Sequence, residues 1–210
     1  ILTRLLQINK PQSAIIFGRK KRRADELAKA LLKAGFQAKA LHGDLTQKER
    51  SNVMDGFKSG LFKILVATDV AARGIHVDGI EVVYNFDLPQ EIEYYVHRIG
   101  RTGRAGMQGT SISFVRSVEM DYIELIEKKT RSEIEIIHAP SNTNVKRAKK
   151  EHLIETIKNV IEEGRGMKHY DTAVTLIEMF GAEMALNAAL EIISPKNQPV
   201  LDVLSKEPPV

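Results

Sequence analysis

Short apolar runs alternate with segments of helical periodicity over the first two thirds of the chain. Predicted strands are residues 13–17, 37–42, 63–68, 82–86, 110–115 and 133–138, and predicted helices are residues 24–34, 47–59, about 90 onward, and 118–129. Strands that alternate with helices in this way are typical of βαβ units and a parallel sheet. The pattern therefore predicts an α/β fold, a doubly wound and mostly parallel sheet with helices on both faces.

Local signals mark several of these boundaries. Thr46 and Glu49 have the spacing of a capping box, which predicts a helix start. Gly35 and Gly60 stand where helices usually end, because glycine adopts the left-handed conformation of a C-cap without strain. These signals support the end of the predicted helix at residues 24–34 and both ends of the predicted helix at residues 47–59.

The pattern changes after Ala139, where the strand signal stops. Residues 140–150 are predicted to be a linker that runs into a basic helix, residues 146–195 a small all-α domain, and residues 196–210 an extended tail. Within the small domain the predicted helices are residues 146–163, 172–180 and 182–193. Three short helices bury little surface among themselves, so we expect them to pack on the main domain or on a second copy of the chain. Residues 1–139 form the main domain in this interpretation.

The composition narrows the class of protein. Hydrophobic residues make up 43% and charged residues 28% of the 210 residues, a balance typical of soluble globular proteins. No apolar run approaches the roughly 20 residues of a membrane span and no signal peptide is apparent, so we expect a cytoplasmic protein without a membrane partner. The chain has no cysteine and its histidines lack ligand spacing, so no metal site is predicted.

A cationic run extends from Arg19 through Arg23. It lies just before and inside the first turn of a predicted helix, where the helix dipole disfavours positive charge, so helix stability does not explain it. Cations at a helix N-terminus suit phosphate groups. A solvated surface stretch is the alternative interpretation. Only 6% of residues are aromatic, which favours contact with a nucleic-acid backbone over base reading.

The most specific segment is His-Arg-Ile-Gly-Arg-Thr-Gly-Arg at residues 97–104. His97 and Arg101 are four residues apart and Arg101 and Arg104 three apart, so a continuous helix would place them on one face. The intervening glycines let another surface approach, and planar guanidinium groups suit bidentate recognition of phosphate. Cations that stabilise a helix C-terminus would explain one arginine but not the spaced set.

Residues 97–104 resemble motif VI of the DEAD-box RNA helicases, and three further motifs follow the family order. Residues 14–17 resemble motif IV, Gly43 with Gln47 and Arg50 resembles the Gln-x-x-Arg element, and residues 66–74 resemble motif V. The resemblance covers residues 1–138 and implies the second RecA-like domain of such a helicase. The closing helices and residues 204–209 are similar to the dimerisation segment of bacterial cold-shock DEAD-box proteins, which implies a homodimer through residues 146–195.

The resemblance also implies residue roles. Arg101 and Arg104 would contact the β- and γ-phosphates of ATP, one of them as an arginine finger, and His97 would link nucleotide to RNA. Arg73 would brace the contact between the two motor domains. Contacts to RNA phosphates would come from Arg19, Lys20, Gln47, Arg50, Thr68 and Gly74.

Two positions depart from the family pattern. His76 stands where motif V normally ends in Asp, the residue that binds the ATP ribose. A neutral imidazole accepts one hydrogen bond without the charge-assisted strength of a carboxylate, and Asp78 is placed to substitute for it. We therefore predict weakened ATP affinity with hydrolysis retained. Lys20 stands where close relatives tend to have Thr; it keeps the attraction for phosphate but loses a short hydroxyl contact.

The sequence contains neither the Gly-x-x-x-x-Gly-Lys-Ser/Thr phosphate loop nor Asp-Glu-Ala-Asp. Mg²⁺ and most contacts to ATP would therefore be supplied by a first RecA-like domain preceding Ile1, and these residues alone should not hydrolyse ATP. The expected protein is an ATP-dependent RNA helicase that separates short duplexes when its two motor domains close. The alternative is a non-catalytic module that binds RNA and associates with itself.

Overall fold

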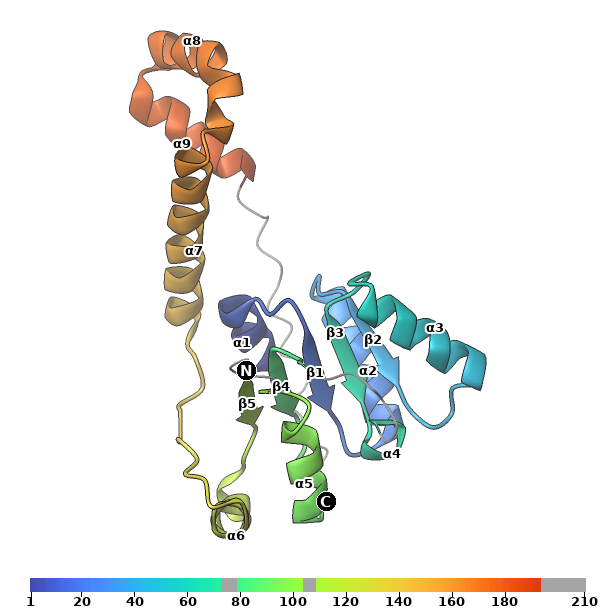
Figure 1. Cartoon of the computed structure of the whole chain (residues 1–210). Coiled ribbons are helices and arrows are strands. Elements are labelled where there is room, and N and C mark those ends of the chain that lie inside the picture. The colour runs from blue at the N-terminus through green and yellow to red at the C-terminus, as the bar shows by residue number, and fades with distance from the viewer. Residues whose placement is uncertain (73–78, 104–108, 194–210) are drawn as a thin grey trace. The chain divides into compact units, whose positions relative to one another are not determined.

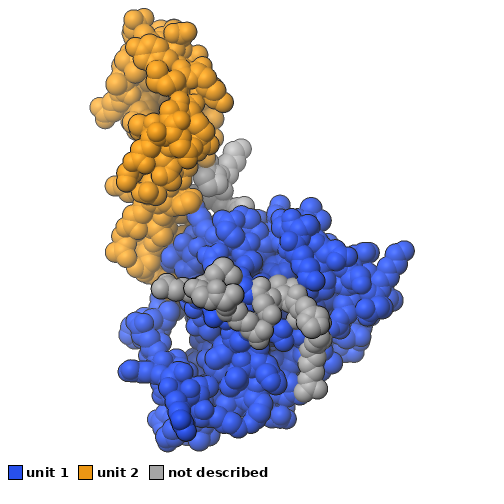
Figure 2. Space-filling view, in the orientation of Figure 1, with its two compact units in different colours: residues 1–139, 201–210 blue, residues 140–200 orange. Residues whose placement is uncertain are grey.

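The computed structural model describes residues 1–72, 79–103 and 109–193. The described residues fall into two compact units, unit 1 with residues 1–139 and unit 2 with residues 140–193 (Figure 2). The predicted extended tail, residues 196–210, lies outside the described residues. None of the described helices is both long enough and apolar enough to span a membrane.

A parallel sheet forms the middle of unit 1 (Figure 1). Its described strands are β1 (Ala14–Phe17), β2 (Ala38–Leu41), β3 (Ile64–Ala67), β4 (Val82–Asn85) and β5 (Thr110–Ser113), in the spatial order β2-β3-β1-β4-β5. All four neighbouring pairs are parallel. The helices of unit 1 are α1 (Leu2–Asn9), α2 (Lys21–Lys33), α3 (Gln47–Lys58), α4 (Asp69–Ala72), α5 (Ile92–Ile99) and α6 (Met120–Thr130), with a 3₁₀ turn at Ser117–Glu119. The predicted doubly wound RecA-like architecture is confirmed.

The central strand β1 shows why both faces of the sheet are covered. Successive side chains of a strand point to opposite faces, and here all four are buried. Ala14 and Ile16 join the cluster formed with α1 and α2. Ile15 and Phe17 join the cluster formed with α3 and α4. A continuous apolar run is what a strand buried on both faces requires.

The helix caps follow the local sequence. Thr46 accepts the Glu49 backbone N–H, and the Glu49 carboxylate accepts the Thr46 N–H, so the predicted capping box is present at the start of α3. Helix α1 was absent from the sequence prediction, although Leu2, Leu5 and Leu6 are buried at helical spacing.

The predicted strand at residues 133–138 is wrong. Residues 132–140 have no regular secondary structure, and the side chains of Ile136 and Ile137 are 70% and 55% exposed. The Ile134 backbone N–H donates to the Glu127 carboxylate of α6 instead of to a strand. Alternating polarity stabilises a strand only where one face is buried against a sheet, and this segment lacks that partner among the described residues.

All the described secondary structure of unit 2 is helical. Its elements are α7 (Asn142–Glu162), a 3₁₀ turn at Arg165–His169, α8 (Tyr170–Phe180) and α9 (Ala182–Ile193). Ser141 caps α7 by accepting the Asn144 N–H, so the helix begins four residues before its predicted start and takes in most of the predicted linker.

Candidate functional site

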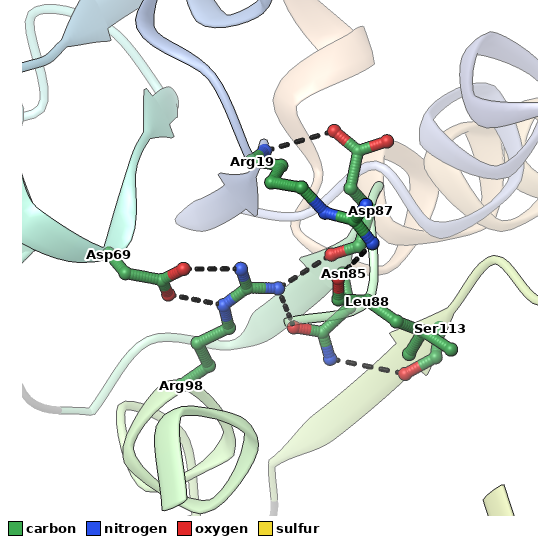
Figure 3. A network of polar contacts seen from close by, with 7 residues as sticks. All are labelled: Arg19, Asp69, Asn85, Asp87, Leu88, Arg98 and Ser113. Carbon is green, nitrogen blue, oxygen red and sulfur yellow. Dashed lines mark hydrogen bonds and ion pairs between the residues drawn. The ribbon is translucent and has the colours of Figure 1, made fainter. Parts of the chain in front are cut away.

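Arg98 lies at the centre of a polar network at one edge of the sheet (Figure 3). Although it is an arginine, it is only 2% exposed. Its Nε and Nη2 donate to the two carboxylate oxygens of Asp69 at 2.6 and 2.7 Å, a bidentate ion pair. Its Nη1 donates to the Asp87 carbonyl at 2.7 Å and to Asn85 Oδ1 at 3.2 Å. The buried charge is thus neutralised and its donors are used, as burial of an ion requires.

The strand register brings these partners together. Phe17, Ala67 and Asn85, the last residues of β1, β3 and β4, are aligned across the sheet. Because the strands are parallel, the residues that follow them meet at one edge, where ligands bind in open α/β sheets. The centroid of the Phe17 ring lies 4.9 Å from the Arg98 guanidinium carbon, which adds a cation–π contact to the network.

Arg19 extends the network toward the predicted RNA contacts. Its backbone N–H donates to the Asp87 carboxylate at 2.9 Å, and its Nη2 donates to the Leu88 carbonyl at 3.0 Å (Figure 3). Asp87 therefore contacts Arg98 through its carbonyl and Arg19 through its carboxylate. The exposed side chain of Lys20 lies at the N-cap of α2.

A pocket of about 210 Å³ opens beside Arg98. Its lining residues are Phe17, Asp69, Ala72, Tyr94, His97, Arg98 and Arg101. Ligand pockets usually enclose about 300–1,000 Å³, so this pocket is smaller than a complete ligand site. It brings together two of the predicted catalytic residues, His97 and Arg101, which share one face of α5 and the turn that follows.

The remaining predicted residues are placed less uniformly. Thr68 is buried at the end of β3, and Gln47 is exposed at the first position of α3. Arg50 donates to the Ala71 carbonyl, so its guanidinium holds α3 to α4 in addition to any contact with RNA. Five predicted site residues lie outside the described residues, namely Arg73, Gly74, His76, Asp78 and Arg104.

His42 holds the loop between β2 and α3. Its side chain is buried, its Nε2 lies 3.0 Å from the Asp25 carboxylate, and its Nδ1 accepts the Asp44 N–H at 3.4 Å. With Nδ1 accepting, Nε2 bears the proton that is shared with Asp25. The loop that contains Gly43 and leads to Gln47 is thereby held to α2, where Asp25 lies.

The sequence prediction assigned no role to Arg98, Asn85 or Asp87. A signal for Arg98 was nevertheless present. The core-facing positions of α5 include Ile92, Tyr95 and Ile99, and Arg98 is three residues from Tyr95, on the same side of the helix. A charged residue on the buried face of a helix requires a partner of opposite charge.

Comparison with known proteins decides the family. Residues 1–106 match the family described as "Helicase conserved C-terminal domain". The chain belongs to this family. It is 42% identical over 211 residues to the DEAD-box ATP-dependent RNA helicase CshA of Bacillus licheniformis, covering 100% of this chain and 43% of that protein. The likeness to DEAD-box RNA helicases is therefore confirmed.

Further relatives agree with this assignment. CshA of Geobacillus kaustophilus is 43% identical over 212 residues, covering 100% of this chain and 45% of that protein. Among solved structures, E. coli SrmB bound to the regulator RraA is 37% identical with a TM-score of 0.60, covering 67% of this chain and 88% of that chain. A DEAD box protein of Methanococcus jannaschii is 42% identical with a TM-score of 0.61, and the match covers 65% of this chain and 38% of that chain. The chain spans less than half the length of the curated relatives.

Proposed function

We propose that this chain is the second motor domain and adjoining helical segment of an ATP-dependent RNA helicase. The observation that carries the proposal is the pocket at the end of the parallel sheet, where His97 and Arg101 lie beside the Asp69–Arg98 ion pair in a domain of the helicase family. ATP and RNA would draw this domain against a first RecA-like domain, and hydrolysis would reopen the cleft. A location in the cytoplasm remains a prediction.

The pocket's chemistry fits one half of a nucleotide site. Arg101, with Arg104 beyond the described residues, would neutralise charge that develops on the transferred phosphoryl group. His97 is exposed at the pocket and would join nucleotide to RNA across the closed cleft. The residues of this chain offer no carboxylate cluster for a cation among those described. Mg²⁺ and the phosphate loop are therefore proposed to belong to the first domain.

RNA would be held by its backbone along the same edge of the sheet. Arg19 and Lys20 precede α2, and Gln47 begins α3, so these side chains all lie near helix N-termini, where phosphate is favoured. Thr68, Arg50 and Gly74 complete the proposed set. Contacts of this kind fix the position of the strand and are insensitive to its sequence.

The test is RNA-stimulated ATPase activity after a first RecA-like domain is supplied, for example from the Bacillus licheniformis relative. We expect activity with both domains and none with residues 1–210 alone. Arg101→Lys should lower kcat by about 10³ or more, since it removes an arginine-finger contact. Lys29→Gln, an exposed change on α2, is the matched control. Absence of ATPase with RNA binding intact would favour the non-catalytic module instead.

Unit 2 is proposed to form a homodimer. Neither α8 nor α9 has a buried residue, and large apolar side chains are exposed along both, with Phe180 at 55%, Met184 at 67% and Ile192 at 84%. Exposed apolar surface of this extent is characteristic of an interaction site. A second copy of the same helices would cover it with matching chemistry.

Light scattering tests the dimer. We expect twice the chain mass of 23.5 kDa for the wild type and a shift to the single-chain mass for Phe180→Glu. Val118→Glu is the control, because Val118 is 83% exposed and belongs to unit 1. A wild-type chain that stays monomeric at micromolar concentration would contradict the dimer.

A further inference from the structure

The first half of α7 carries a dense cationic cluster that the proposed motor function does not use. Lys146, Arg147, Lys149 and Lys150 fall within five residues, and no acidic residue occurs between Asn142 and Lys150. At about 100° per residue their side chains occupy an arc of about 160°, less than half of the helix circumference. We refer to these four residues as the α7 cationic cluster.

The cluster is poorly compensated within the helix. Lys146 and Lys150 are four residues apart, and Lys146–Lys149 and Arg147–Lys150 are three apart, so three neighbouring pairs on the helix surface repel. Among the described residues, the cluster forms one ion pair, between Arg147 and Glu151 at 3.7 Å. Both side chains of that pair are about 70% exposed. Intramolecular stability therefore does not account for the cluster.

The same side of α7 changes character at Leu153. From there the side chains of Leu153, Ile154, Ile157 and Ile161 continue on the arc occupied by the cluster, with Ile154 55% and Ile161 71% exposed. One face of a single helix is thus cationic over its first half and apolar over its second. The two halves suit different partners, since a polyanion neutralises the first and apolar surface covers the second.

We propose that the α7 cationic cluster is a second RNA-binding site, which contacts backbone phosphates independently of nucleotide. This inference rests on the proposed helicase function and adds a contact outside the motor domain. Lysine and arginine side chains on an exposed helix face bind phosphates without reading bases. A dimer would carry two such clusters, which would raise the avidity for RNA that reaches both.

RNA fits this surface better than an anionic membrane does. Helices that bind membranes interleave cations with large apolar side chains, which insert beside the headgroups. Here Val145 is buried and Ala148 is small, so the cationic half presents no apolar side chain that could insert.

The experiment compares two quadruple variants of the 210-residue chain for binding to a labelled 20-nucleotide single-stranded RNA without nucleotide. The test variant is Lys146→Gln, Arg147→Gln, Lys149→Gln and Lys150→Gln. The control neutralises four exposed lysines of unit 1, at positions 29, 33, 39 and 58, and so loses the same net charge. Anisotropy is measured between 50 and 200 mM salt, and light scattering reports the mass of each variant.

We expect the test variant to bind RNA at least 10-fold more weakly at 100 mM salt. The slope of log K against log salt should fall in magnitude by about 3, because each of the four lost phosphate contacts contributes about 0.7. The control should change affinity by less than about 3-fold. Equal losses in the two variants would show a general charge effect and overturn the proposal. Tighter binding of the wild type to phosphatidylglycerol vesicles than to RNA would also overturn it.

A footprint of the wild-type chain makes the result independent of the folding of the variants. RNA should protect Lys146, Lys149 and Lys150 from acetylation, read by mass spectrometry, and leave Lys29 and Lys33 reactive. Unprotected α7 lysines would refute the α7 site. An Arg19→Gln, Lys20→Gln variant separates the two proposals: if it alone weakens RNA binding, the α7 site fails, and if it has no effect, the proposed motor-domain contact with RNA fails.

Discussion

Replacing Arg98 with methionine should destabilise unit 1 by about 3 kcal/mol. Removal of one partner of a buried ion pair costs about 3–5 kcal/mol, because the remaining charge stays buried. Arg98 is 2% exposed, whereas the Asp69 side chain is 20% exposed and water can solvate part of its charge, which places the cost at the lower end. The Asp87 carbonyl would also lose its donor. Methionine keeps most of the volume, so cavity formation adds little.

Urea unfolding followed by near-UV circular dichroism of tyrosine measures this loss in unit 1. Four of the five tyrosines, at positions 84, 94, 95 and 122, lie in that unit, and the chain has no tryptophan. The corresponding fall in Tm for a unit of this size is about 10 °C. A double-mutant cycle with Asp69→Asn should give a coupling energy of about 2 kcal/mol, since the two side chains form a bidentate pair.

The exposed ion pair between Lys129 and Glu93 provides the control. Their side chains are 53% and 57% exposed, so solvent screens the pair and a cycle there should yield a much smaller coupling energy than the cycle at Arg98 and Asp69. The reasoning is refuted if Arg98→Met costs less than about 1 kcal/mol, or if its effect and that of Asp69→Asn are additive. Either result would mean that the guanidinium is not held as the contacts indicate.

Four further predictions concern single positions. Burial raises the pKa of Tyr84 above its ordinary value of 10.0, so the folded state holds the proton more tightly than the unfolded state does. The free energy of unfolding should therefore fall as the pH rises above about 10, and Tyr84→Phe should reduce that fall in urea unfolding between pH 9 and 11. The same pH dependence in the wild type and the variant would disprove this. Thr46→Ala should cost about 1 kcal/mol through loss of the N-cap while Thr46→Ser should be nearly neutral; equal losses in chemical denaturation would contradict the capping role. A Cβ at Gly109 would clash with Thr102 Oγ1 and with the backbone of Gly103, so Gly109→Ala should lower Tm clearly. Gly43→Ala should not lower it, because nothing lies within 4 Å of a Cβ at Gly43, and similar Tm values for the two variants would argue against the close approach at Gly109. His76→Asp should lower the KM for ATP in the two-domain enzyme with kcat little changed, and an unchanged KM would remove the proposed effect of His76.

The sheet was predictable because its strands are short, apolar and separated by capped helices. Burial on both faces gives β1 and β3 continuous apolar runs that stand out from the amphipathic helices around them. Residues 133–138 alternate charged and apolar side chains in the way of a half-buried strand. A strand also needs a neighbour with free backbone groups, and the sequence does not show which edge is available. Tertiary contacts decided that case, with Glu127 accepting the Ile134 N–H.

The site was only partly predictable, for a related reason. Spacing identifies residues that share a helix face, and so it identified His97 and Arg101, which the structure places in one pocket. Spacing does not show which residues from elsewhere in the chain contact the other faces of the same helix. Arg98 is rotated by about 100° from His97, and its partners Asp69 and Asp87 are 29 and 11 residues away in the chain. Only the alignment of β1, β3 and β4 brings them within reach.

Because different sides of α5 carry the pocket residues and Arg98, the helix can be fixed to the sheet while His97 stays available at the pocket. His97 and Arg101 line the pocket on one side of the helix, while Arg98 anchors another side to Asp69. Asp69 directly follows Thr68, and Asp87, which also contacts Arg98, accepts the Arg19 N–H. The Arg98 guanidinium thus connects the helix that carries His97 to residues that adjoin or contact two of the proposed RNA contacts, Thr68 and Arg19. Because the ion pair is bidentate, lysine cannot reproduce its geometry. In the proposed helicase, movement of one group of residues would therefore be transmitted to the other, as coupling between ATP binding and RNA binding requires.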